Sequence, residues 1–152
     1  EFRRVLFRSA IADGALYVGG GLDSLNDTTA LRVAKIDLET AAIDTTFTQA
    51  TGFDGFVFAL LAAGDSLYVA GEMTYYRGSD AQSIAKLDLE SGDLDTTFTQ
   101  SVGLESNGWF IGAYALTGVG GSLWIGGEFD SYRGKIAPNL TTVHLTTGDL
   151  TD

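Results

Sequence analysis

Acidic side chains that recur in pairs are the groups in this sequence best suited to chemistry. The recurring positions are Asp37 and Asp88, Glu39 and Glu90, and Asp44 and Asp95. Two carboxylates that flank a glycosidic bond can hydrolyse it, one as the acid and the other as the base or nucleophile. These carboxylates, however, return at a fixed interval of 51 residues, and that periodicity favours a role in the scaffold. We therefore predict no catalytic residues.

Nucleophilic and zinc chemistry lacks the necessary residues. The chain has no cysteine, and its single histidine is His144. Without a second histidine or a Gly-x-Ser-x-Gly elbow, neither a nucleophilic triad nor a zinc site can be assembled. His144 occupies the same repeat position as Asp37 and Asp88 on an alternating stretch, so we interpret it as a surface substitution.

A weak calcium signal lies in the segment GLDSLNDTT. Asp23, Asn26 and Asp27 supply oxygen ligands on one glycine-led loop. Calcium requires six to eight oxygens, and the spacing differs from that of a DxDxDG loop. A solvated turn is the favoured interpretation. We predict no cofactor and keep calcium as the alternative.

Two tyrosine–arginine pairs are candidates for ligand binding. Tyr76 with Arg77 and Tyr132 with Arg133 each precede a glycine at the same repeat position, so we expect both on one side of the molecule. Tyrosine and arginine combine contact area with directed hydrogen bonds. In the alternative, the tyrosine packs between repeats while the arginine neutralises an acidic loop.

The segment GLESNGWF, residues 103–110, is the strongest feature that does not repeat. It carries Trp109 and Phe110. An aromatic side chain on a lengthened loop can stack on a sugar or anchor a protein partner, because it offers a large area at a low cost in entropy. Packing against a neighbouring repeat is the alternative.

The elements that must position these residues are themselves repeats. The segment AKIDLETAAIDTTFTQ, residues 34–49, returns at 85–100 as AKLDLESGDLDTTFTQ with eleven identities. A second block occurs three times, as ALYVGG from residue 15, SLYVAG from residue 66 and SLWIGG from residue 122. The last two copies are 56 residues apart, so five residues are inserted between Gln100 and Ala115. We divide the chain into units 10–49, 50–100 and 101–152.

Each unit has the pattern of antiparallel strands. FVFALLAA is a short apolar run before a Gly-Asp turn, LYVAG ends on glycine, and SIAKLDLE alternates with a period of two in its second half. A weaker fourth strand, LDTTF, follows the SGDL turn. Four strands in about 50 residues indicate a β-propeller blade. We therefore predict an all-β chain of about two and a half to three four-stranded antiparallel blades, an open part of a larger propeller.

Several repeated residues are predicted to hold these blades together. Asp44 and Asp95 precede Thr-Thr-Phe, where a short acceptor can bind backbone amides of the next turn. Phe47 and Phe98 then provide apolar anchors. Glycine ends one strand of each unit where a side chain would obstruct the backbone, at Gly20, Gly71 and Gly127.

At the motifs LYVGG, LYVAG and LWIGG, then YRG, then IAKLDLESGDLDTTF, the sequence resembles the delta-60 repeat β-propeller family of secreted or surface bacterial proteins. The match extends over residues 10–152. Kelch-type propellers are less similar, because their late-blade tryptophan has no counterpart here. The resemblance implies a fold and a repeat role, and it implies no catalytic residues.

The two ends depart from this pattern. Residues 1–9, EFRRVLFRS, match the translation of a sequencing adapter, and we predict that they are not native. A genuine basic first strand is the alternative. The last unit stops where another DTTF segment is due, so we expect the parent protein to hold further blades.

The net charge of −11 limits which partners and which cellular compartment are expected. An acidic surface repels phosphate backbones, so nucleic acid is not an expected partner. No apolar stretch reaches the roughly 20 residues of a spanning helix. Repulsion within an acidic domain is screened at high salt, which favours extracellular, marine or otherwise salty surroundings.

We therefore expect a non-enzymatic scaffold at the bacterial cell surface or outside it, which serves adhesion or binds a protein or polysaccharide. The alternative is part of a propeller enzyme, such as a polysaccharide lyase or hydrolase, with its catalytic residues in other blades.

Overall fold

The computed structural model describes residues 8–108 and 111–151. Strands and turns make up this part of the chain, which contains no helix. It therefore contains no helix that could span a membrane. The prediction of an all-β chain is confirmed.

Three antiparallel sheets, one for each repeat, form the body of the molecule. The first sheet consists of β1 (Arg8–Ala12), β2 (Ala15–Gly19) and β5 (Val33–Asp37). The second consists of β6 (Phe56–Ala63), β7 (Ser66–Glu72) and β10 (Ile84–Asp88). The third consists of β12 (Gly112–Val119), β13 (Ser122–Glu128) and β16 (Leu140–His144). In each sheet the middle strand carries the LYVGG-type motif.

The weak fourth strand of each unit is reduced to one bridge. The bridges join Ile36 to Ile43, Leu87 to Leu94, and Val143 to Leu150. After the first two bridges the chain enters a DTTF turn instead of extending the sheet, since Asp44 and Asp95 bind the amides that follow them. Each unit is thus three strands and the beginning of a fourth.

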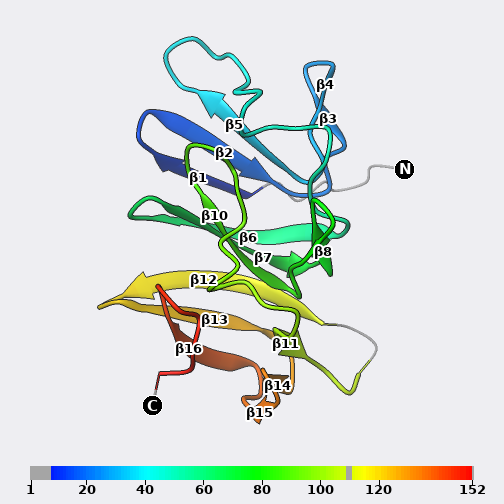
Figure 1. Cartoon of the computed structure of the whole chain (residues 1–152), viewed down its shortest axis with the longest axis vertical. Coiled ribbons are helices and arrows are strands. Elements are labelled where there is room, and N and C mark those ends of the chain that lie inside the picture. Colours follow the sequence, from blue (N-terminus) through cyan, green and yellow to red (C-terminus); the bar gives the residue numbers. More distant parts are fainter. Residues whose placement is uncertain (1–7, 109–110, 152) are drawn as a thin grey trace.

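The sheets are stacked on one another along the length of the molecule (Figure 1). Strand β6 contacts both β1 and β12, so the first strands of the three units lie side by side. Arg8 and Ser9, the last residues of the segment predicted to be an adapter translation, lie in β1 and pair with Gly19 and Val18 of β2.

Two hydrophobic clusters fill the spaces between the sheets. Because side chains alternate along a strand, β7 contributes to both: Leu67 and Val69 face the first sheet, whereas Tyr68 and Ala70 face the third. All four side chains are buried. The second sheet therefore has two apolar faces, one for each neighbouring sheet.

A small hairpin connects the second and third strands of every sheet. The hairpins are β3 (Ser24–Leu25) with β4 (Thr28–Thr29), β8 (Tyr75–Tyr76) with β9 (Ser79–Asp80), and β14 (Ser131–Tyr132) with β15 (Lys135–Ile136). A further strand, β11 (Leu104–Glu105), pairs with β14. Both central residues of the first turn, Asn26 and Asp27, have positive φ angles of 46° and 62°. This is the requirement of a two-residue type I′ turn, which favours asparagine and aspartate.

The first strands of the second and third sheets each contain a bulge. The register with the neighbouring strand shifts between Val57 and Ala59, and again between Ala113 and Ala115. One extra residue is therefore inserted in each strand, Phe58 in β6 and Tyr114 in β12. A bulge re-aims the side chain that it carries.

Two glycines stand opposite these bulges and are required by the backbone. A Cβ atom on Gly71 would lie 2.0 Å from the carbonyl oxygen of Phe56, and one on Gly127 would lie 2.1 Å from that of Gly112. No side chain fits at such distances. Gly20, their counterpart in the first sheet, has an extended backbone with a φ angle of 159°.

Candidate functional site

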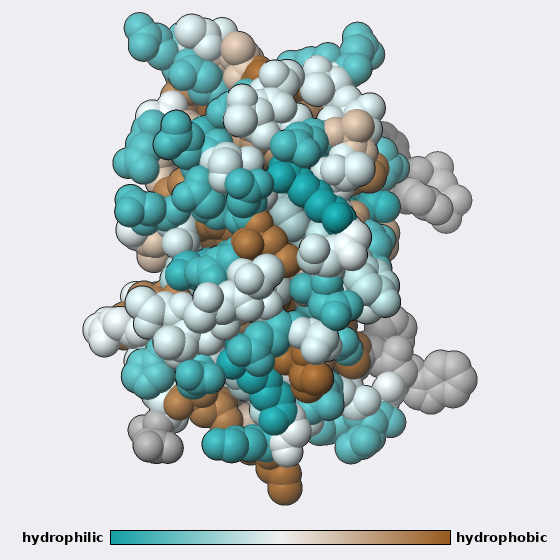
Figure 2. All heavy atoms as spheres, viewed as in Figure 1, coloured by the Kyte–Doolittle hydropathy of each residue, from teal (hydrophilic) through white to brown (hydrophobic). Residues whose placement is uncertain are grey.

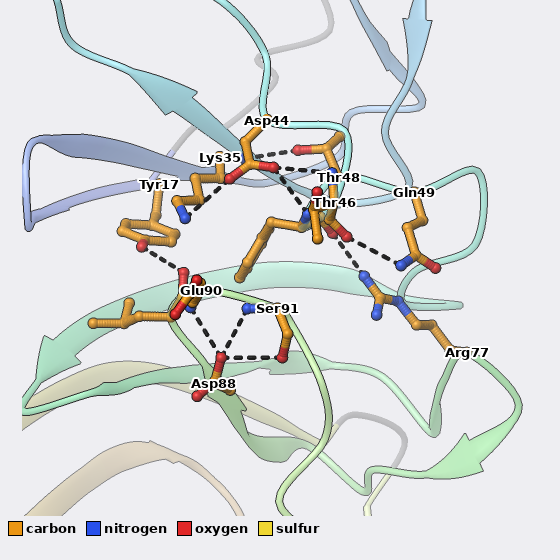
Figure 3. A network of polar contacts seen from close by, with 12 residues as sticks. Tyr17, Lys35, Asp44, Thr46, Thr48, Gln49, Arg77, Asp88, Glu90 and Ser91 are labelled. Atoms are coloured by element: carbon orange, nitrogen blue, oxygen red, sulfur yellow. Dashed lines mark hydrogen bonds and ion pairs between the residues drawn. The ribbon is translucent and has the colours of Figure 1, made fainter.

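The repeated carboxylates of the DTTF turns are engaged in holding the turn. The Asp44 carboxylate accepts hydrogen bonds from the backbone amides of Thr46 and Phe47, at 2.9 and 3.2 Å, and its second oxygen lies 3.0 Å from the Lys35 ammonium (Figure 3). Asp95 repeats the arrangement with Thr97, Phe98 and Lys86. Burial opposes ionisation of Asp44, but the Lys35 hydrogen bond and the two amides outweigh it and lower the pKa of Asp44 below its usual value.

Asp37 and Asp88 serve the preceding turn in the same way. Asp88 accepts hydrogen bonds from the amides of Ser91 and Glu90 and from the Ser91 hydroxyl. The amide of Ser91 is the main cause of the lowered pKa of Asp88. The third unit has His144 at this position, and it is exposed there. The four periodic aspartates, Asp37, Asp44, Asp88 and Asp95, therefore all accept hydrogen bonds from backbone amides.

The tyrosine–arginine pairs join one unit to the preceding one. Arg77 donates a hydrogen bond of 2.6 Å to the carbonyl of Phe47, and Arg133 donates one of 2.6 Å to the carbonyl of Phe98. Figure 3 shows Arg77 reaching from its hairpin toward the first DTTF turn. Each arginine is also paired with an exposed aspartate, Asp93 or Asp149.

The tyrosines of these pairs are buried. The hydroxyls of Tyr76 and Tyr132 donate to the carbonyls of Gly92 and Gly148, each at 2.7 Å. Burial raises the pKa of Tyr132 to about 12. Both rings are closed to solvent.

The acidic loop at residues 23–27 is occupied by contacts within the chain. Asp23 forms an ion pair with Arg32, and Asn26 with Asp27 forms the type I′ turn described above. Within the described residues, no group of three His, Cys, Asp or Glu side chains is arranged to hold a metal ion.

Three exposed or half-buried aromatic rings gather where β6 and β12 begin. We call Phe56, Phe58 and Tyr114 the aromatic edge. The ring centroids of Phe56 and Phe58 are 6.5 Å apart with planes inclined by 22°, and those of Phe58 and Tyr114 are 5.2 Å apart at 43°. Phe56 is 49% exposed and Tyr114 45% exposed. The two bulges bring rings from neighbouring sheets into one row.

Charged groups border the aromatic edge at both ends. The Arg32 guanidinium lies 5.3 Å from the centroid of the Phe56 ring, within the range of a cation–π contact. At the other end the Tyr114 hydroxyl lies 3.5 Å from the Glu128 carboxylate. Partial burial and the negative charges of Glu128 and Glu72 raise the pKa of Tyr114. The edge thus offers apolar ring faces between a cation and two carboxylates.

A cavity of about 500 Å³ opens beside the aromatic edge. It is lined by Asp54, Gly55, Phe56, Glu72, Met73, Thr74, Gln82, Ser83, Gly108 and Ile111. Trp109 and Phe110, singled out in the sequence, lie outside the described residues, but Gly108 and Ile111 on either side of them line this cavity. The inserted segment therefore reaches the aromatic edge. A second cavity of about 430 Å³ lies between the first two sheets, over Asp13, Tyr17, Lys35, Asp65, Asp88, Leu89 and Glu90.

Sequence reasoning missed the aromatic edge because its residues lie within apolar strands. In FVFALLAA every second side chain is expected to be buried, and only the bulge changes that pattern. One signal was available: Phe58 and Tyr114 are aromatic at positions 56 residues apart, the interval between the second and third units.

Comparisons with known proteins agree with this architecture. Residues 65–98 match the model of a family described as a domain of unknown function (DUF5122) beta-propeller. Among solved structures, the chain is similar to the crystal structure of the computationally designed Ika8 protein, with a TM-score of 0.58 and 10% identity. That alignment covers 95% of this chain and 35% of the designed chain, so the present chain spans about a third of its length. No curated protein sequence matches. At this identity the likeness concerns the fold alone, and the family match supports a β-propeller.

Proposed function

We propose that this chain is a run of propeller blades of the delta-60 type that acts as a non-enzymatic, extracellular scaffold and binds polysaccharide at the aromatic edge. The observation that carries the proposal is the row of exposed rings from Phe56 to Tyr114. The repeated aspartates do not compete with it as a site, because they are bound to backbone amides.

Polysaccharide suits the aromatic edge better than other ligands because the edge has apolar rings in its middle and polar groups at its two ends. Sugar rings present an apolar face to an aromatic ring and a rim of hydroxyls to polar neighbours. Phe56, Phe58 and Tyr114 supply the apolar area. Arg32 and Glu128 then lie where hydroxyls at either end would accept and donate hydrogen bonds. The lining of binding sites is typically of this kind, mostly apolar with a few directed polar groups.

Glycan-array binding of four forms of the protein tests the proposal. Binding should fall at least about tenfold from the wild type to Phe56→Ala and to Tyr114→Ala, since truncation of a dominant aromatic contact at a binding surface costs about 2 kcal/mol or more. Trp109→Ala, in the inserted segment, tests whether that segment contributes.

Tyr75→Ala is the matched control. Tyr75 is 47% exposed, close to the exposure of Tyr114, and lies on the β8–β9 hairpin outside the aromatic edge. Its removal should leave binding unchanged. Equal signals from the wild type, Phe56→Ala and Tyr114→Ala would refute the assignment of the edge as the binding surface.

A further inference from the structure

The inserted segment contains an asparagine followed by glycine, the pair in which an asparagine side chain most readily loses its amide. The nitrogen of the following residue closes a succinimide ring on the asparagine side chain, and glycine leaves that nitrogen unhindered. Of the three asparagines in the chain, only Asn107 precedes a glycine, Gly108. Asn26 and Asn139 are also exposed, but each precedes a residue with a side chain. Exposure is therefore common to all three, and the following glycine is particular to Asn107.

Asn107 and Gly108 lie on the surface, in the loop that follows β11. Figure 1 shows this loop projecting from the side of the third sheet. Both residues are exposed, and the face drawn in Figure 2 is mostly hydrophilic or intermediate in hydropathy, with small hydrophobic patches. Within the described part of the chain, no hydrogen bond holds the side-chain amide of Asn107. This amide can therefore turn toward the Gly108 nitrogen, and water has access to it.

Two hydrogen bonds connect the Gly108 N–H to a carboxylate. The Gly108 amide donates a hydrogen bond of 3.0 Å to the Ser106 hydroxyl oxygen. That hydroxyl donates in turn to a carboxylate oxygen of Asp130, at 3.2 Å, and the same oxygen accepts a bond of 2.7 Å from the backbone amide of Asn107. Because a hydroxyl both accepts and donates, a proton that leaves Gly108 has a path through Ser106 to Asp130.

The fold keeps this proton path in place. A Cβ atom at position 108 would lie 3.3 Å from the Ser106 Oγ, tighter than an ordinary van der Waals contact, so glycine lets the hydroxyl approach the amide. The backbone of Asp130 is held on both sides, since its amide donates to the carbonyl of Glu105 and its carbonyl accepts from the amide of Ala137. The proton acceptor is therefore positioned by the folded β14–β15 hairpin and is lost when the chain unfolds.

We propose that Asn107 is a site of self-catalysed deamidation, promoted by Ser106 and Asp130. Ser106 takes the proton of the Gly108 amide as its own proton passes to Asp130. The Gly108 nitrogen forms a bond to the Asn107 Cγ, the bond from that carbon to the side-chain nitrogen breaks, and the proton returns to the departing nitrogen, which leaves as ammonia. Water then opens the ring at either carbonyl and yields aspartate or isoaspartate. The chain thus loses ammonia and gains water, and no other reactant is needed.

The product changes the surface beside the aromatic edge. Gly108 lines the cavity of about 500 Å³ there, together with Asp54 and Glu72. Aspartate or isoaspartate at position 107 adds one negative charge next to that lining, and isoaspartate also lengthens the backbone by a methylene group. The reaction itself does not depend on which ligand the aromatic edge binds.

Peptide mapping by mass spectrometry, after incubation of the whole chain at pH 8 in native buffer and in urea, tests the proposal. Aspartate and isoaspartate should accumulate at position 107, while Asn26 and Asn139 remain unchanged. The reaction should be at least about tenfold faster in native buffer than in urea, since a positioned proton acceptor contributes about 10²–10⁴-fold. A native rate no higher than the rate in urea would overturn the proposal.

Three variants separate the proton path from the mobility of the loop. Ser106→Ala and Asp130→Ala should slow the native reaction to the rate in urea, and should leave the rate in urea unchanged. Ser131→Ala is the matched control, because it removes a nearby serine hydroxyl that bonds Glu105 and lies outside the path. Its native rate should equal that of the wild type. Reaction of Ser106→Ala as fast as the wild type, or faster, would refute the roles of Ser106 and Asp130.

Discussion

Aspartate acts in this chain as a hydrogen-bond acceptor for turns. Its carboxylate binds backbone amides at four repeated positions, Asp37, Asp44, Asp88 and Asp95. Hydrogen bonds from Thr40 lower the pKa of Asp37. The turn amides and, at Asp44 and Asp95, a lysine lower the pKa values of the other three aspartates in the same way. A carboxylate whose pKa is lower in the folded state stabilises the fold above its unfolded pKa. That stabilisation is lost as the pH falls through the folded value.

We therefore predict that stability falls below about pH 4, near the ordinary aspartate pKa of 3.8. Relief of acidic self-repulsion acts in the opposite direction over the same range, so the wild type alone is not decisive. The double variant Asp44→Asn with Asp95→Asn should lose less stability between pH 5 and pH 3 than the wild type does. Urea unfolding at each pH measures the difference, and parallel curves would contradict the prediction.

The residues of the turns could be predicted from the sequence, whereas those of the aromatic edge could not. The repeat itself marks Asp44, Asp95, Phe47 and Phe98 as scaffold. A short acceptor side chain before Thr-Thr-Phe is expected to bind the backbone amides of the next turn. Tyr76 and Arg77 left two interpretations open, because the choice depends on whether a neighbouring unit covers them. That is a tertiary fact, and sequence spacing does not contain it.

At the scale of elements, the arginine on each small hairpin fastens it to the turn of the preceding unit. Arg133 donates to the Phe98 carbonyl, and its side chain is mostly buried. We predict that Arg133→Ala destabilises the chain by about 2 kcal/mol, the contribution of a hydrogen bond from a charged donor. Arg133→Lys should recover little of this, because lysine lacks the planar fork.

Asp149→Ala is the control for this arginine. It removes only the partner of an ion pair whose aspartate is 69% exposed, and such pairs contribute about 0–1 kcal/mol. Thermal or urea unfolding compares the three variants. Equal losses in Arg133→Ala and Asp149→Ala would mean that the ion pair, and not the carbonyl contact, fastens the hairpin.

The bulged strands are positioned by glycines that admit no side chain. Gly127→Ala places a Cβ 2.1 Å from the Gly112 carbonyl oxygen, so we predict a loss of at least about 2 kcal/mol through forced backbone movement. The adjacent Gly126→Ala meets nothing closer than 3.8 Å and should change stability by less than about 0.5 kcal/mol. Similar unfolding midpoints for the two variants would show that the backbone opposite the bulge can move away from an added Cβ atom at little cost in stability.

The strands of each unit were predictable, and the irregularities between them were not. Alternation and glycine punctuation locate the three main strands, because both reflect the pleat of a half-buried strand. The fourth strand was expected from LDTTF, yet it is one bridge, since the aspartate turns the chain away. The bulges at Phe58 and Tyr114 have no local signature, because a register shift is defined only against the paired strand.

The whole molecule combines apolar junctions between its sheets with a strongly acidic surface. The net charge of −11 makes the compact chain repel itself, whereas the packing of Leu67, Val69 and Tyr68 between the sheets does not depend on charge. Ionic strength changes chiefly the repulsion, because the Debye length falls from about 8 Å at 0.15 M to about 3 Å at 1 M.

We predict that the free energy of unfolding rises between 0.05 M and 1 M sodium chloride. Urea unfolding at each salt concentration measures the change. A fold held chiefly by its ion pairs would lose stability instead, because salt screens attraction between exposed charges as well. The expected sign follows from the excess of acidic side chains, 20 against nine lysines and arginines. Lower stability at high salt would therefore show that the ion pairs, and not self-repulsion, dominate the electrostatics of the fold.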